Sequence, residues 1–278
     1  MLYFALLFSV VLLLCGSSER REARYGLSVA AVLLAWLVGY HSMLFSAFVL
    51  AYMGLTYWMH AQPLPRPWLW GRYFLWFLFS AALVLHAVPG YEGLLVVEAQ
   101  PWKPGAVSTP FYLNTDKVLV AWSLLTWLPL WGRSLPALSR AIPASAPIGL
   151  MVLGISVIMG VAVMLRLIDV SLGLPMWFGF FALSNLVNTC IAEELLFRGV
   201  VQRWLQQRFN LWLAVLLASV LFGLAHFGGG MAFVLVATLA GLLYGAVYAL
   251  TGRLWWAIAA HWLLNMVHLV GFTYPMLA

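Results

Sequence analysis

Long apolar segments with short connections dominate this sequence and restrict its possible folds more than any other feature. A helix needs about 20 apolar residues to cross the hydrocarbon core of a bilayer. Because 65% of the residues are hydrophobic and 8% are charged, no water-soluble fold could bury the apolar surface. We therefore predict an all-α fold, a polytopic transmembrane bundle of about 8–10 helices. The apolar segments are 2–15, 26–40, 43–59, 73–89, 117–131, 148–168, 176–199, 211–227, 231–250 and 254–273.

Two regions differ in their polar content. Residues 1–145 are expected to form N-terminal transmembrane helices with an outer loop at 90–116, and residues 146–278 a core that carries the intramembrane polar groups. The apolar stretch 26–59 is either one steep helix or a hairpin that turns near Tyr40-His41-Ser42. The spacing Gly241-xxx-Gly245 indicates close helix packing.

The basic residues are spread over connections rather than gathered in a patch, which argues against a nucleic-acid partner and makes the lipid bilayer the expected partner. If 26–59 is a hairpin, eleven basic residues fall on one side of the membrane and three on the other. By the positive-inside rule the larger set faces the cytoplasm and the N-terminus lies outside. The larger set is Arg20, Arg21, Arg24, Arg66, Arg72, Arg133, Arg140, Arg198, Arg203, Arg208 and Arg253, and the smaller is Lys103, Lys117 and Arg166.

Two adjacent carboxylates, Glu193 and Glu194, interrupt an otherwise apolar segment. Each ionised carboxylate at the centre of a membrane helix costs about 2.5–3.5 kcal/mol. Glu194 and Arg198 have i, i+4 spacing and can pair along one helix face, whereas Glu193 is rotated about 100° away. Glu193 is therefore the candidate general base, and the alternative for Glu194 and Arg198 is a purely structural ion pair.

Two histidines and an asparagine in later apolar segments are candidates for the same site. His261 and Asn265 have i, i+4 spacing and share a helix face, so their donors can serve as an oxyanion trap. If the chain reverses near residues 209–211, Glu193 and His226 lie about sixteen residues on either side and reach equal depth at ~1.5 Å per residue. This requires residues 200–208 to continue the helix or to lie along the interface. The other histidines have no such helical partner, and only His268, seven residues beyond His261, has a position from which it can line the same cavity. These histidines are His41, His60, His86 and His268.

These residues resemble the motifs of the CAAX-protease and bacteriocin-processing family of intramembrane proteases, also called the abortive-infection family. Its Glu-Glu-x-x-x-Arg motif matches Glu193 to Arg198, its Phe-x-x-x-His motif matches Phe222 to His226, and its His-x-x-x-Asn motif matches His261 to Asn265. The resemblance covers roughly residues 150–270. Three motifs in the same order, all on apolar segments, are a specific match.

The resemblance implies an intramembrane endopeptidase of the glutamate type. Glu193 and His226 would activate the attacking water, while His261 and Asn265 would stabilise the oxyanion. Glu194, Arg198 and Phe222 would support them. No metal or other cofactor is favoured, although Glu193, His226 and His261 would form a legitimate zinc set with an open fourth position.

The substrate implied by the resemblance is a membrane-associated or lipidated peptide or protein, in a multi-pass protein of a bacterial inner membrane with its site accessible from the cytoplasm. The sequence also leaves other functions open. The same polar residues fit an ion-coupled transporter, since intramembrane acids commonly form ion relays. They also fit a non-catalytic scaffold or bacteriocin-immunity protein.

Overall fold

The computed structural model describes residues 1–61, 66–128, 143 and 145–278. Every apolar segment expected to be helical coincides with a helix or a run of consecutive helices, so the all-α polytopic class is confirmed. Among the described residues, five helices are long and apolar enough to cross a membrane: Met43–His60, Ser145–Met164, Phe178–Gln206, Met231–Thr251 and Leu254–Gly271. Shorter apolar helices cover Leu2–Ser17, Trp68–Val84 and Leu211–Leu224.

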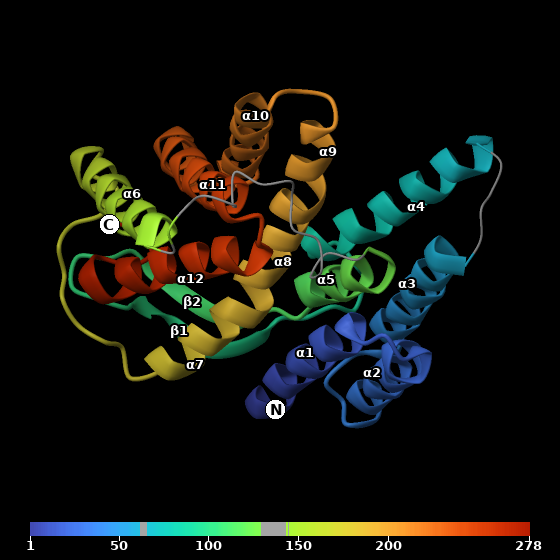
Figure 1. The fold of residues 1–278 in the computed structure, drawn as a ribbon. Coiled ribbons are helices and arrows are strands. Elements are labelled where there is room, and N and C mark those ends of the chain that lie inside the picture. Colours follow the sequence, from blue (N-terminus) through green and yellow to red (C-terminus); the bar gives the residue numbers. More distant parts are fainter. Residues whose placement is uncertain (62–65, 129–142, 144) are drawn as a thin grey trace. The chain divides into compact units, whose positions relative to one another are not determined.

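The described residues divide into two compact units (Figure 1). Unit 1 draws on Met1–Val96, Tyr112–Trp131 and Val187–Ala192, and unit 2 on Val97–Phe111, Gly132–Leu186 and Glu193–Ala278. The described helices that lie wholly in unit 1 are α1 (Leu2–Ser17), the π-helical turn η1 (Glu22–Leu27), α2 (Ser28–Leu37), α3 (Met43–Ala61), α4 (Arg66–Val84) and α5 (Asp116–Trp127). Helices α2 and α3 pack against each other, which confirms the hairpin interpretation of residues 26–59.

Helix α5 is the centre of unit 1, because it packs against α1, α3 and α4. Several of its polar side chains are buried and bonded to α2, α3 and α4. Trp122 Nε1 donates to Ser28 Oγ at 2.8 Å. Ser123 Oγ pairs with Thr56 Oγ1 at 2.7 Å and accepts from Trp76 Nε1 at 2.9 Å. A polar group in an apolar interior needs such a partner, so these bonds fix how the helices of unit 1 pack.

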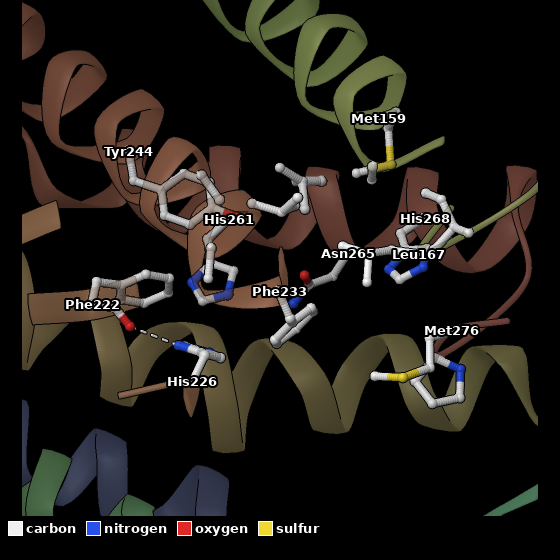
Figure 2. Close-up of a pocket in the computed structure, with 17 residues that line it drawn as sticks. Met159, Leu167, Phe222, His226, Phe233, Tyr244, His261, Asn265, His268 and Met276 are labelled. Atoms are coloured by element: carbon white, nitrogen blue, oxygen red, sulfur yellow. Dashed lines mark hydrogen bonds between the residues drawn. The ribbon is translucent and has the colours of Figure 1, made fainter. Parts of the chain in front are cut away.

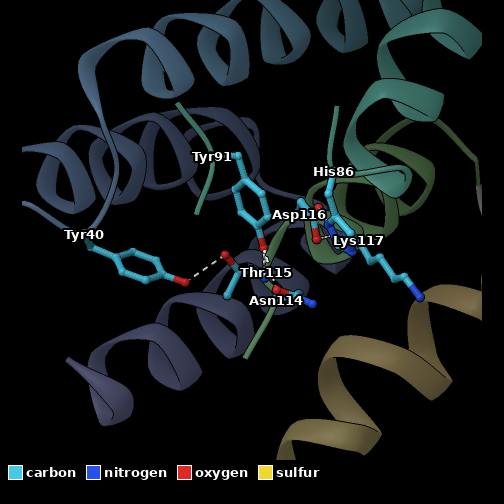
Figure 3. Close-up of polar contacts among 7 residues, drawn as sticks. All are labelled: Tyr40, His86, Tyr91, Asn114, Thr115, Asp116 and Lys117. Atoms are coloured by element: carbon cyan, nitrogen blue, oxygen red, sulfur yellow. Dashed lines mark hydrogen bonds and ion pairs between the residues drawn. The ribbon is translucent and has the colours of Figure 1, made fainter. Parts of the chain in front are cut away.

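The start of α5 carries a second polar cluster (Figure 3). The Thr115 hydroxyl pairs with the Tyr40 hydroxyl at 2.9 Å, and its backbone N–H donates to the Tyr91 hydroxyl at 3.1 Å. The buried Asp116 carboxylate accepts a hydrogen bond from His86 Nδ1, which raises the pKa of His86. His86 therefore has a carboxylate partner in unit 1. Nothing in its local sequence indicated Asp116, which lies 30 residues further along the chain.

Residues 90–116 were expected to form a loop, but they contain two paired strands, β1 (Leu94–Pro101) and β2 (Ser108–Leu113). The connection between the strands packs in unit 2, where the Trp102 ring lies 4.1 Å from that of Trp177. Lys103 is buried, and its Nζ donates to the carbonyls of Val270 at 2.9 Å and of Ser171. Pro104-Gly105, between two runs of strand-forming residues, is the local signal that indicated a turn.

Unit 2 is organised around α11 (Met231–Thr251), which packs against α6 (Ser145–Met164), α10 (Leu211–Leu224) and α12 (Leu254–Gly271). Small residues allow α10 and α11 to approach closely. A Cβ at Gly241 would lie 3.1 Å from the Ser219 Cα, and one at Gly245 would lie 3.0 Å from Val215 Cγ1. The predicted packing role of Gly241 and Gly245 is confirmed.

One continuous helix runs from Phe178 to Gln206 (yellow to orange in Figure 1). Residues 200–208 therefore continue this helix as far as Gln206. Several turns are π-helical, a form that occurs mainly as short bulges and frequently at functional sites. The successive parts are α7 (Phe178–Ser184), η2 (Asn185–Cys190), α8 (Ile191–Glu194), η3 (Leu195–Gln202) and α9 (Arg203–Gln206).

Candidate active site

A cavity of about 90 Å³ lies within unit 2 and brings together side chains from two of the three predicted motif segments (Figure 2). His226, His261 and Asn265 all line it. His226 and His261 lie at one end, Asn265 lies between, and His268 with Met276 lies at the other end. Most of the remaining lining is apolar: Met159, Ala162, Leu167, Ile168, Phe222, Phe233, Val236, Ala237, Ala240, Tyr244, Leu264 and Pro275.

Glu194 connects the first motif with the third. Its Oε2 accepts from Arg198 Nε at 2.8 Å, which confirms the i, i+4 pairing, and its Oε1 accepts from His261 Nδ1 at 3.0 Å. The two charged residues have 0% exposure, and His261 has 4%. An ionised carboxylate only accepts hydrogen bonds, so Nδ1 of His261 carries a proton here. The contact therefore fixes the ring orientation of His261, and Glu194 supports the site more directly than expected.

Arg198 was counted among the cytoplasmic charges, but its side chain is fully buried and therefore lies in the interior between the helices. Its guanidinium lies 5.3 Å from the centre of the Phe222 ring and 5.8 Å from that of Tyr244. Neither Nη atom has a hydrogen-bond partner in the described part of the chain. Two aromatic faces therefore take the place of hydrogen-bond acceptors, as in other cation–π arrangements.

Phe222 holds the two histidines in place. The centre of its ring lies 4.6 Å from that of His226 and 5.8 Å from that of His261. Tyr244 stacks on the ring of His261, with ring centres 4.6 Å apart and an interplanar angle of 15°. The predicted supporting role of Phe222 thus has a clear packing basis. Tyr244 was not predicted, because an aromatic residue in an apolar helix carries no local signal of such a role.

His226 was expected inside a helix, and that expectation is wrong. Helix α10 ends at Leu224, and His226 follows in the connection to α11, before the short 3₁₀ turn η4 (Phe227–Gly229). Its Nδ1 donates to the Phe222 carbonyl at 2.8 Å. The 14 residues of α10 rise only ~21 Å, less than the ~30 Å hydrocarbon core. Non-helical backbone at membrane depth is tolerated where it lines a cavity, as this connection does.

Asn265 has a partner that sequence reasoning missed. Its Nδ2 donates to Asn185 Oδ1, on the helix that carries the carboxylates, at 3.1 Å. Asn185 is a polar residue in the apolar segment 176–199, and this was the available signal. Periodicity within one helix could not show that Asn185 faces α12.

Glu193 is not among the residues that line the cavity. It is half-buried and directly precedes Glu194, so its Cα lies about 3.8 Å from that of the carboxylate that contacts His261. The structure thus brings three of the four predicted catalytic side chains to one cavity and leaves the fourth, Glu193, outside the lining.

His268 lines the cavity as expected, and its Nε2 contacts the Thr273 carbonyl at 3.1 Å. This end of the cavity is closed by extended segments that pair through their backbones. Leu277 N–H donates to the Leu167 carbonyl at 2.8 Å, and Thr273 N–H to the Asp169 carbonyl at 2.8 Å. Met276 and Leu167 belong to the cavity lining, so these segments form its end wall.

The alternative zinc set does not fit the geometry. Across residues 1–61, 66–128, 143 and 145–278, no three His, Cys, Asp or Glu side chains are grouped so that they could hold a metal ion. In particular, Glu193, His226 and His261 do not form such a group. We therefore assign no catalytic step to a metal.

These features define the class of the protein: a multi-pass, all-α membrane protein with a mostly apolar cavity between helices that also holds histidine and asparagine side chains. Residues 175–267 match the family model described as type II CAAX prenyl endopeptidase Rce1-like. The protein named "Putative membrane peptidase YdiL" of Bacillus subtilis (strain 168) is 35% identical over 75 residues, which is 27% of this chain and 30% of that protein. No solved structure matches the chain. The region 175–267 is therefore similar to the Rce1-like family, in agreement with the resemblance in the sequence.

Proposed function

We propose that the protein is an intramembrane endopeptidase that hydrolyses a peptide bond of a membrane-associated or lipidated peptide or protein. The observation that carries this proposal is the convergence of His226, His261 and Asn265 on one cavity. The buried pair of Glu194 and Arg198 lies against one of these residues. The Rce1-like match over residues 175–267 supports the same reaction class.

The proposed mechanism uses side chains alone. Glu193 and His226 accept a proton from a water molecule, whose oxygen attacks the carbonyl carbon of the scissile bond. Because the Nδ1 of His226 donates to the Phe222 carbonyl, its Nε2 is the nitrogen available to this water. Asn265 and His261 stabilise the negative charge that develops on the carbonyl oxygen. For His261 this requires a proton on Nε2 as well as on Nδ1, because the Nδ1 proton is bonded to Glu194. When the C–N bond breaks, the proton taken from water passes to the leaving nitrogen.

The substrate class follows from the cavity lining. Apolar side chains, including Met159, Leu167 and Met276, surround the polar groups. Such a lining favours an apolar peptide segment over a charged one, because charged groups lose hydration on entry. Delivery from the bilayer is the natural route for a peptide of this kind.

The test is the replacement Glu193→Gln, combined with identification of trapped peptides and new peptide termini in the host membrane. Loss of the general base is expected to lower cleavage by ~10²–10⁴-fold while expression and thermal stability stay unchanged. Glu98→Gln is the matched control, because it makes the same chemical change at an exposed position of β1.

If Glu193→Gln still cleaves peptide, Glu193 is not the general base. If Glu194→Gln loses cleavage while Glu193→Gln retains it, Glu194 takes the role of base. An immunity phenotype that survives Glu193→Gln would instead favour the non-catalytic scaffold. Proton or ion flux that depends on Glu193 without any cleavage would favour the transporter.

We also propose a bacterial inner membrane as the location, with the site reached from the cytoplasmic side. The excess of basic residues on one predicted side supports this orientation. Arg133 and Arg140, which contribute to the count, lie outside the described residues.

A further inference from the structure

The polar residues of α12 are bonded to the helix Phe178–Gln206 at several levels. Asn265 Nδ2 donates to Asn185 Oδ1 at 3.1 Å. One turn earlier, Trp262 Nε1 donates to the Ala182 carbonyl at 2.8 Å. The bond to Asn185 and the contact between His261 and Glu194 attach both predicted oxyanion donors to the same helix.

The bond to Asn185 has a particular consequence for the amide of Asn265. An amide group has two N–H donors on one side and a carbonyl acceptor on the other. A rotation of about 180° exchanges these with little change in shape. In an oxyanion site this exchange would replace a donor by an acceptor that repels the developing negative charge. An acceptor bonded to one N–H removes that ambiguity.

We propose that Asn185 is a positioning residue for Asn265: its Oδ1 accepts one N–H of the Asn265 amide and thereby orients the amide donor toward the cavity. The inference rests on the proposed function, since it concerns the oxyanion site of the same reaction. Asn265 itself lines the cavity, whereas Asn185 does not. Asn185 therefore acts through Asn265 rather than on the substrate.

The test compares Asn185→Leu, which removes the acceptor at similar size, with Asn185→Asp, which retains an acceptor oxygen. Loss of an oxyanion donor lowers kcat by ~10²–10³-fold, and a misoriented donor is expected to cost about 10–100-fold in kcat. KM is expected to change by less than about twofold, because the oxyanion exists only in the transition state. Asn185→Asp should recover most of the lost kcat.

Two controls separate positioning from general stability. Trp262→Phe removes the neighbouring bond to Ala182 but keeps an aromatic ring, so its kcat should match that of the wild type. In an Asn265→Ala background, Asn185→Leu should have no additional effect on kcat, because a residue that acts only through Asn265 loses its effect when Asn265 is absent.

A readout independent of activity completes the test. In protein labelled with ¹⁵N-asparagine, Asn185→Leu should shift the side-chain amide resonances of Asn265, whereas Trp262→Phe should not. Unchanged resonances, unchanged kcat, or an equal loss of kcat in the Asn265→Ala background would each overturn the inference. If the wild type cleaves no peptide, the proposed function fails, and the resonances still decide whether Asn185 orients Asn265.

Discussion

Among single residues, His41 has the least favourable surroundings in unit 1. It is 6% exposed, and neither ring nitrogen has a hydrogen-bond partner within the described ranges. The rings of Phe8, Tyr40 and Phe45 surround it, with centres 5.1, 4.5 and 4.7 Å away. Burial lowers the pKa of His41 to about 4 from its ordinary value of 6.5. Between pH 6.5 and about pH 4 the unfolded chain binds more protons than the folded protein. The free energy of unfolding therefore decreases as the pH falls through this range.

We therefore expect His41→Phe to stabilise the protein by about 1–3 kcal/mol, since it removes a buried group without partners. The gain should be larger at pH 5 than at pH 7.5, and thermal unfolding in detergent at the two values measures it. His86→Asn is the contrasting control. The bond to Asp116 raises the pKa of His86 in the folded protein. The stability that this bond adds is therefore fully present below the pKa of His86 in the unfolded chain, and it is lost as the pH rises through its pKa in the folded protein. A less stable His41→Phe would show that the imidazole is needed.

Residue spacing predicted part of the candidate site. The pairing of Glu194 with Arg198 and the shared face of His261 and Asn265 follow from helical periodicity and are confirmed. The contacts between Glu194 and His261 and between Asn185 and Asn265 join residues far apart in the chain. Periodicity shows which residues share a face of one helix, but it does not show which helix that face meets.

At the scale of elements, apolar length predicted the helices well, because membrane helices satisfy their backbone hydrogen bonds internally. It failed where tertiary packing decides. The two strands depend on packing between Trp102 and Trp177 and on the bonds of Lys103. The end of α10 before His226 depends on the cavity that the connection lines. Such features cannot be read from local hydropathy.

The contact between α10 and α11 gives a prediction at this scale. A Cβ at Gly223 would lie 1.9 Å from Thr238 Oγ1 and 2.7 Å from the Val234 carbonyl oxygen. Thr238 Oγ1 also donates to that carbonyl at 2.8 Å, so a methyl group must push the helices apart. We expect Gly223→Ala to lower the free energy of unfolding by about 1–3 kcal/mol. Chemical unfolding in mixed micelles measures the loss.

Gly160→Ala in α6 is the matched control, because nothing lies within 4 Å of a Cβ at Gly160. Replacing glycine by alanine inside a helix adds the same intrinsic stabilisation in both variants, about 1 kcal/mol at most. Equal stability of the two variants would mean that α10 and α11 leave room for a methyl group at Gly223.

For the whole molecule, composition predicted the all-α polytopic class, but it carries no information on which residues gather into a cofactor site. The absence of a metal-binding group among the described residues leads to a prediction. We expect purified protein to contain no stoichiometric zinc and to retain its activity in a strong chelator. Elemental analysis and a cleavage assay with and without the chelator test this together. Zinc bound in proportion to activity would contradict the metal-free mechanism.

The bond between Glu194 and His261 also bears on how the chain enters the membrane during synthesis. A chain is synthesised from its N-terminus, and the two residues are 67 positions apart. The carboxylate must therefore reach the bilayer long before its histidine partner exists. Arg198, one turn away in the same helix, is already present at that time and can enter with Glu194 as a neutral pair. Arg198 can thus neutralise Glu194 during membrane insertion, before His261 is synthesised.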